Sequence, residues 1–142
     1  MREWRDSFVE KLGKVQNQWN KRFDEAMENT INPVFDEFAA FLRTNGFHVS
    51  QPMKQEDRRS FKFELAENAY LLLIFRSTAI GEFETRCECF VPGNDPMLSK
   101  SIGRLADVDE SWTRKFFQSS LDVFIEQLAS QTPRVSEELA MV

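Results

Sequence analysis

The chain has 142 residues, and its balance of 42% hydrophobic and 29% charged residues excludes wholesale disorder and suits one globular domain. A formal net charge of −5 argues against nucleic-acid binding, because no basic excess is present to neutralise phosphates. No run of about 18 apolar residues could span a membrane, the first residues lack the apolar core of a secretory signal, and two cysteines do not make a disulfide scaffold. We therefore expect a cytoplasmic protein.

The order of the sequence patterns predicts an α+β fold in two layers. A long N-terminal helix, kinked or broken at Pro33, is expected to precede an antiparallel meander of about four strands and a C-terminal helix that packs on the sheet. The expected parts of this single domain are 1–45 (helical), 47–91 (antiparallel sheet), 92–109 (connecting segment), 110–131 (C-terminal helix) and 132–142 (tail).

Between Trp4 and about Asn29 the chain contains no proline, which favours a continuous helix. Its apolar residues form a narrow stripe with an eleven-residue repeat, which keeps the stripe nearly straight along the helix. A helix of about 25 residues spans about 37 Å, longer than a domain of this size needs. The stripe consists of Trp4, Phe8, Leu12, Val15, Trp19, Phe23 and Ala26.

A second helical segment follows this first one. Asn32 can cap a separate helix with Pro33 in its first turn, or Pro33 can kink one longer helix, and the sequence leaves both open. Apolar residues recur at helical spacing from Val34 to Leu42. Gly46 is a strong stop, because glycine readily adopts the left-handed conformation that ends helices.

The middle third of the chain alternates in the manner of β-strands. A polar loop is expected from Pro52 to Asp57, between the first strand and the second. The second and fourth strands place apolar residues on one face and charged residues on the other, whereas the third is apolar on both faces. The expected strands are 47–49, 59–65, 70–77 and 82–91.

The last third is a connection followed by a helix. The segment from Met97 to Val108 shows no clear period, and because long structureless loops are uncommon in compact domains we expect a strand or helical turn near Ser101–Leu105. Asp109 or Ser111 is expected to cap the final helix, and Pro133 to end it. The apolar face of this helix consists of Trp112, Phe116, Phe117, Leu121, Phe124, Ile125 and Leu128.

Two surfaces carry more apolar residues than we expect one chain to bury. The third strand is apolar on both faces, so the face that the helices leave free needs cover from the 97–108 segment, from the first helix or from another chain. The stripe of the first helix has the narrow form used in helix-to-helix packing. The candidate interface residues are Trp4, Phe8, Leu12, Val15, Trp19, Phe23, Tyr70, Leu72 and Ile74.

Cys87 and Cys89 form the motif most suggestive of chemistry, since their thiols share one strand face and could join His48 in a metal site. A structural zinc site needs four ligands, and buried cysteines at apolar strand positions are common, so we expect no metal. His48 is expected to be a polar residue of a short strand and not a general base.

Charged clusters are expected to be solvated surfaces. Glu82, Glu84 and Glu88 share a strand face with Arg86, and paired carboxylates of this kind most often lie in a mixed-charge surface. A second cluster could seat an anion, but acidic residues within the same run favour a neutralised loop; it consists of Lys54, Arg58, Arg59 and Lys62.

The sequence predicts no enzyme: the GxSxG, HExxH, Walker and GxGxxG motifs are absent, and no catalytic or cofactor-binding residue is proposed. We expect a non-catalytic protein-interaction module that forms a homodimer or higher homo-oligomer, with no membrane or nucleic-acid partner. Two alternatives remain: a small acidic adaptor, similar to secretion chaperones in size and charge, that binds another chain's segment, and a small-ligand binder with a Phe-lined pocket. Removal of residues 1–30 is expected to abolish the oligomer and leave the sheet domain folded.

Overall fold

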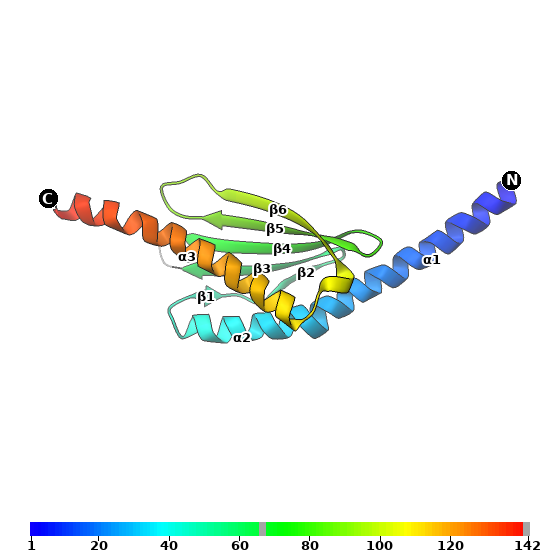
Figure 1. Ribbon diagram of the computed structural model, residues 1–142, viewed down its shortest axis with the longest axis horizontal. Helices are drawn as coiled ribbons and strands as arrows, with labels where there is room; N and C mark the ends of the chain where they lie inside the picture. Colours follow the sequence, from blue (N-terminus) through cyan, green and yellow to red (C-terminus); the bar gives the residue numbers. More distant parts are fainter. Residues whose placement is uncertain (66–67, 141–142) are drawn as a thin grey trace.

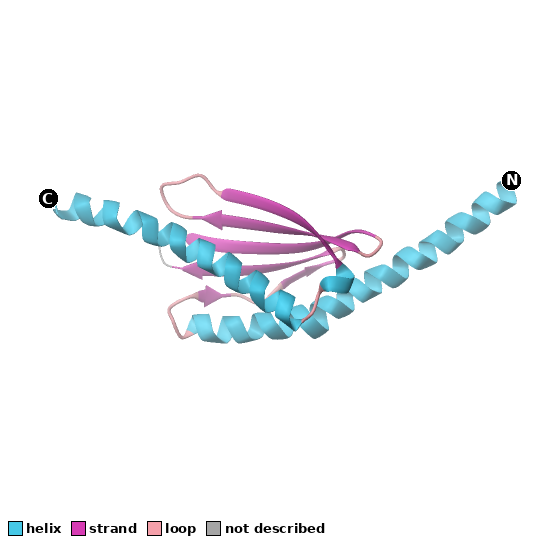
Figure 2. Ribbon diagram, in the orientation of Figure 1, coloured by secondary structure: helices cyan, strands magenta, loops and turns pink. Residues whose placement is uncertain are grey.

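The protein is an α+β domain of two layers, in which helices lie against one face of an antiparallel sheet (Figures 1 and 2). The computed structural model describes residues 1–65 and 68–140, with side chains as far as Ser130. The elements are α1 (Arg2–Ala26), the π-helix η1 (Met27–Ile31), α2 (Asn32–Arg43), β1 (His48–Val49), β2 (Met53–Gln55), β3 (Arg58–Leu65), β4 (Ala69–Ala79), β5 (Glu82–Phe90), β6 (Met97–Arg104), the 3₁₀-helix η2 (Leu105–Asp107) and α3 (Glu110–Ala140).

The N-terminal helix is continuous and bends ahead of Pro33 (Figure 1). Met27 and Asn32, which flank the junctions, both keep right-handed helical angles. Pro33 lies in the first turn of α2 and has no backbone N–H to donate. The N–H of Asn32 donates to the carbonyl of Met27, five residues earlier, as in a π-helix. Of the two possibilities that the sequence left open, the structure shows the kink.

The sheet is antiparallel throughout, in the order β1-β3-β4-β5-β6. β1 and β2 both pair with β3, at opposite ends of its outer edge. The loop expected from Pro52 to Asp57 therefore contains a strand, β2, and this expectation was wrong. No alternation marks β2 in the sequence, because its three side chains are all exposed.

β6 is the element hidden in the segment from Met97 to Val108. It pairs with β5 along its whole length, and η2 follows it. The connecting segment expected at 92–109 thus contains an edge strand that extends the meander. Seven of its eight residues are exposed and Gly103 is half-buried, so neither face has the continuous apolar pattern by which a buried strand is recognised.

Phenylalanine rings fill the space between the two layers. Phe35 of α2 and Phe117 of α3 meet the sheet residues Phe61 and Phe63, with ring centroids 4.9–6.2 Å apart. Phe75 meets Phe61 edge-on. Burial of each ring stabilises the fold by about 1.5–3 kcal/mol. These five rings contact one another in a packed core and do not line a hollow.

α3 begins where the sequence predicts and continues further. The carboxylate of Asp109 accepts a hydrogen bond of 2.7 Å from the backbone N–H of Trp112, so Asp109 is the cap. The helix expected to end at Pro133 continues to Ala140, since the fixed φ of proline is itself helical and only one hydrogen bond is lost. The expected tail at 132–142 is therefore helix as far as Ala140, and residues 141–142 lie outside the described residues. Ile125, expected on the buried face, is 43% exposed.

Candidate interaction surfaces

The outer part of α1 projects beyond the sheet, and its apolar stripe is exposed there (Figure 1). The exposed fractions are 61% for Trp4, 50% for Phe8, 36% for Leu12 and 38% for Val15. The rings of Trp4 and Phe8 stack with their centroids 5.2 Å apart, which shields each ring only in part. Four of the candidate interface residues therefore form one free surface, which we call the α1 stripe.

The same stripe enters the core at the inner end of α1. Trp19 is half-buried over the β4–β5 turn, where a Cβ added to Gly81 would lie 3.7 Å from its ring. Gly81 has a φ of +76°, a conformation that glycine adopts without strain. Phe23 is 2% exposed, so this candidate interface residue belongs to the core and leaves no free surface.

A buried arginine holds the inner end of α1 against the sheet. Arg59 of β3 is 1% exposed, and its Nη2 donates to Oδ1 of Asp24 at 2.8 Å. Its Nη1 donates to the backbone carbonyls of Gln55 and Arg58, both at 3.1 Å. Glu28 of η1 lies 3.9 Å from the Nε of the same guanidinium. These contacts set the direction in which α1 leaves the body.

The other members of this basic cluster also meet carboxylates. Lys54 lies 3.8 Å from Glu28, and Arg58 lies 3.3 Å from Asp57. Lys62 lies 3.2 Å from Glu64, its neighbour on β3. The positive charge expected to be neutralised is therefore balanced within the protein, which leaves the cluster unsuited to an anion.

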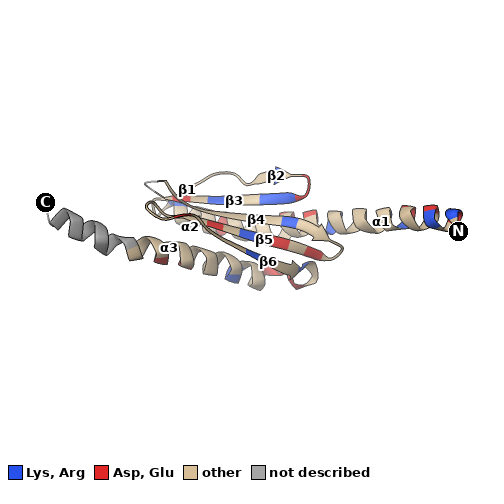
Figure 3. Ribbon diagram, turned by 90° about the horizontal axis from the view of Figure 1, so that it is seen from above, with Lys and Arg blue, Asp and Glu red and all other residues tan. Residues whose placement is uncertain are grey.

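The sheet face opposite the helices carries the remaining candidate interface residues. Tyr70, Leu72 and Ile74 are half-buried on β4, and no helix or strand among the described residues lies over them. Figure 3 shows α3 on one side of the sheet and mixed charges along the strands. Cover comes from neighbouring strands, since Lys62 Nζ lies 4.9 Å from the Tyr70 ring centroid. Tyr70 also stacks on Phe90 at 5.6 Å, and Leu72 lies across from Lys62.

Carboxylates on this face belong to the same mixed surface. Glu84 pairs with Arg86, and the hydrogen bond from Arg86 lowers the pKa of the Glu84 carboxyl. Burial raises the pKa of the Tyr70 phenol, and the nearby charge of Glu88 raises it further. Glu82 lies across from Arg104 at the end of β5. Of these glutamates, Glu84 pairs with Arg86, Glu88 lies beside the Tyr70 hydroxyl, and Glu82 has Arg104 across the ladder.

The cysteines and the histidine lie on different parts of the sheet. Cys89 is buried on β5 and Cys87 is half-buried beside it, whereas His48 is exposed on β1, with β3 and β4 between. Burial raises the pKa of both thiols. Within the described part of the chain, no three His, Cys, Asp or Glu side chains gather closely enough to hold a metal ion.

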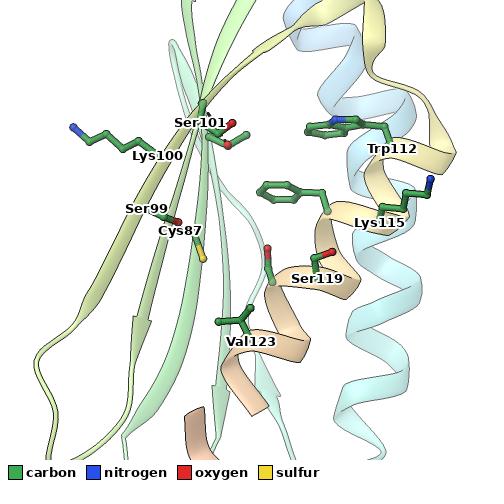
Figure 4. Close-up of a pocket in the computed structure, with 11 residues that line it drawn as sticks. Cys87, Ser99, Lys100, Ser101, Trp112, Lys115, Ser119 and Val123 are labelled. Carbon is green, nitrogen blue, oxygen red and sulfur yellow. Dashed lines mark hydrogen bonds between the residues drawn. The ribbon is translucent and has the colours of Figure 1, made fainter. Parts of the chain in front are cut away.

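A groove of about 530 Å³ runs between α3 and the edge strand β6 (Figure 4). Its α3 wall consists of Trp112, Phe116, Ser119, Ser120 and Val123, with Lys115 at the rim. Its sheet wall consists of Thr85, Cys87, Ser99 and Ser101, together with Lys100. The Lys100 side chain points away from the groove in Figure 4, toward the other face of the sheet.

A signal for this surface was present in the sequence. In β6, Ser99, Ser101 and Gly103 are small, and Leu98 and Ile102 alternate with them. Leu98 and Ile102 are 72% and 60% exposed. One face of the strand carries only small residues, and the other mixes Leu98 and Ile102 with Lys100, so neither face shows the continuous apolar pattern of a buried strand.

No protein-family model matches this chain, and neither the curated proteins nor the solved structures include one that is detectably similar to it. Over the described residues, none of the helices combines the length and the apolar character needed to cross a membrane.

Proposed function

We propose that this protein is a non-catalytic interaction module that self-associates through the α1 stripe, with α1 of a second copy packed antiparallel along it. The observation that carries the proposal is the exposure of Trp4, Phe8, Leu12 and Val15 in one line on a helix that projects from the body. Exposed apolar surface of this kind, bordered by charge, is typical of interaction sites.

A projecting helix also gains stability from a partner. Isolated helices of 12–15 residues are marginal in water, because most helical stability in proteins comes from packing of the apolar face. The inner end of α1 is held by Phe23 and Arg59. Over the part of the chain that the structure describes, the outer part of α1 has contacts between its own turns, such as the Trp4–Phe8 stack. A second helix along the stripe would bury all four of its residues.

The sizes of the stripe residues favour a second copy in antiparallel orientation. If two α1 segments cross between Phe8 and Leu12, each Phe8 lies opposite a Leu12 of the other copy, and each Trp4 lies opposite a Val15. Every large ring then faces an aliphatic side chain, as close packing requires. In such a dimer the two-fold axis repeats each of these contacts, so both helices use the same residues in the same way.

Charge and shape agree with this orientation. Residues 2–14 carry four basic residues (Arg2, Arg5, Lys11 and Lys14) and three acidic residues (Glu3, Asp6 and Glu10), so two copies meet without a large excess of one sign. Antiparallel packing also keeps the two bodies at opposite ends. A parallel helix on the same stripe would meet the β4–β5 turn, which already contacts Trp19.

We propose no catalytic step because of the surroundings of the two candidate groups, the β5 carboxylates and the cysteine thiols. The candidate carboxylates of β5 lie in a mixed-charge surface, and Glu84 pairs with Arg86. The raised pKa values of Cys87 and Cys89 leave little thiolate at neutral pH, and the thiolate is the nucleophilic form.

The test is the absolute mass in solution, by light scattering on a size-exclusion column over a range of concentrations. The proposal expects at least twice 16.6 kDa for the native chain. Phe8→Glu removes two rings per dimer, each worth about 1.5–3 kcal/mol, so the dissociation constant should rise at least about 100-fold. The control is Val9→Glu, since Val9 is 65% exposed on the neighbouring face of α1 and should leave the mass unchanged. A native chain of 16.6 kDa at every concentration, or equal effects of the two variants, would refute the proposal.

A further inference from the structure

β6 forms an open edge of the sheet along its whole length. It pairs with β5 over Met97–Arg104, and no strand among the described residues lies on its other side. Its outer backbone N–H and C=O groups are therefore available to another strand. The opposite edge of the sheet is protected differently, because β1 and β2 divide the edge of β3 into two short pieces.

The groove continues this open edge on the helix side. α3 packs over β4 and β5, and the groove separates it from β6 (Figure 4). Trp112, Phe116 and Val123 give the groove an apolar wall, and Val123 is 42% exposed. A strand added to β6 would turn every second side chain toward α3, at a spacing of about 6.6 Å, and so into the space that the groove leaves.

The occupant of this groove must bring large side chains. β6 of a second copy would present Ser99, Ser101 and Gly103 on that face, which are too small to reach the wall formed by α3. An extended segment of another protein with leucine-like residues at alternate positions would fill the same space. The volume of about 530 Å³ thus favours a hetero-partner over a copy of this chain.

The charges on the other face of β6 select acidic residues in that segment. Lys100 lies across from Arg86 on β5, and its charge also acts on Glu84, which already pairs with Arg86. An acidic residue directly across from Lys100 on the outer side would make the opposite-charge pair that antiparallel strands favour. Arg104 provides a second cation at the end of the same face, although Asp107 already pairs with it.

We infer that the β6 edge and the α3–β6 groove form a binding site for an extended segment of another protein, in which large apolar residues alternate with acidic ones. The segment adds to the sheet as a seventh strand. Its apolar side chains pack on Trp112, Phe116 and Val123, and its acidic side chains lie on the other face beside Lys100. The site is separate from the α1 stripe and does not depend on self-association.

The test uses the full chain and a short fluorescent peptide in which leucine and glutamate alternate, with binding measured by fluorescence polarisation. A peptide of the same composition, with its leucines and glutamates in separate blocks, controls for nonspecific attraction. The alternating peptide should bind and the block peptide should not. Amide hydrogen exchange of residues 97–104 should slow when the alternating peptide is bound, because the free edge then becomes hydrogen-bonded.

Two pairs of variants examine the two faces of the site. Val123→Glu should weaken binding of the alternating peptide about tenfold, because it places a carboxylate in the apolar wall. Its control is Ile125→Glu, since Ile125 is equally exposed on α3 but lies outside the groove. Lys100→Glu should weaken binding about fivefold and favour a leucine–lysine peptide instead. The control Lys21→Glu makes the same charge change on α1.

The outcomes separate this inference from the proposed self-association. Loss of binding in Val123→Glu with an unchanged solution mass supports the groove site, whatever the native mass is. Failure of the alternating peptide to bind, or equal binding by the four variants, overturns the inference. A fall in the mass of the native oligomer on Val123→Glu would show that a second copy occupies the groove, and would also overturn it.

Discussion

Arg59 is the residue on which the position of α1 depends. Its guanidinium is buried at 1% exposure; among the described residues, the carboxylate of Asp24 at 2.8 Å is its close anionic partner, and Glu28 lies further away at 3.9 Å. Two backbone carbonyls take further hydrogen bonds from the same group. A buried charge that loses its partner costs more than the pair contributes, because the desolvation remains while the attraction is gone.

Asp24→Ala should therefore destabilise the protein by about 1.5–3 kcal/mol, the range for hydrogen bonds to charged groups. The measurement is urea denaturation followed by circular dichroism, with all variants at one protein concentration. Glu25→Ala is the matched control, because Glu25 is the exposed neighbour of Asp24 on α1. Equal midpoints for the two variants would mean that Arg59 is satisfied by the carbonyls and by Glu28.

At the scale of the element, β6 lies where it does because Gly103 has no side chain. Gly103 pairs with Phe83 across the β5–β6 ladder, and a Cβ at Gly103 would lie 2.8 Å from the ring. Phe83 is 1% exposed and packs edge-on against Trp112, so its ring has little room to move. One small residue thus permits the close approach of β6 to the Phe83 ring.

Gly103→Ala should cost about 1–3 kcal/mol, the usual range for overpacking a filled core. It should also accelerate amide hydrogen exchange along β6, since the clash displaces the strand from β5. Ser101→Ala, two residues earlier on the same face, is the control and should change neither quantity. Native-like exchange in Gly103→Ala would show that the Phe83 ring can shift at low cost.

At the scale of the whole molecule, the boundary between the body and the projecting helix differs from the one expected from the sequence. Removal of residues 1–30 would delete Phe23 and Met27 from the core, together with Asp24. The prediction that the sheet domain stays folded after this deletion therefore does not fit the structure. The part of α1 that can be removed without loss of buried residues ends before Trp19.

Deletion of residues 1–15 should leave a folded body and abolish self-association, because it removes the α1 stripe and retains every buried residue of α1 and η1. Deletion of residues 1–30 should unfold the domain. Circular dichroism and light scattering on both truncations measure the two effects. A body that remains oligomeric without residues 1–15 would place the contact elsewhere, on the open sheet face or the β6 edge.

Much of the fold follows from local pattern. The helical spacing in α1 and α2, the alternation in β3 and β5, and the stop at Gly46 predicted these elements close to their observed bounds. Gly46 indeed has a φ of +86°. The pattern missed β2 altogether, whereas the strand or helical turn expected near Ser101–Leu105 is confirmed by β6 and η2. The bounds of β6 could not be predicted, because its side chains, like those of β2, are mostly exposed and leave no apolar period to detect.

The same distinction holds for the candidate sites. The apolar stripe of α1 was evident from spacing alone, because it repeats along a single helix. Its division into an exposed part and a buried part was not, since only the packing of Trp19 on Gly81 and of Arg59 on Asp24 decides where the helix leaves the sheet. The α3–β6 groove joins residues far apart in the chain. By itself the sequence determined which faces are apolar, since each face is a local periodicity; the tertiary structure alone decided which of those faces remain uncovered, because cover comes from residues distant in sequence.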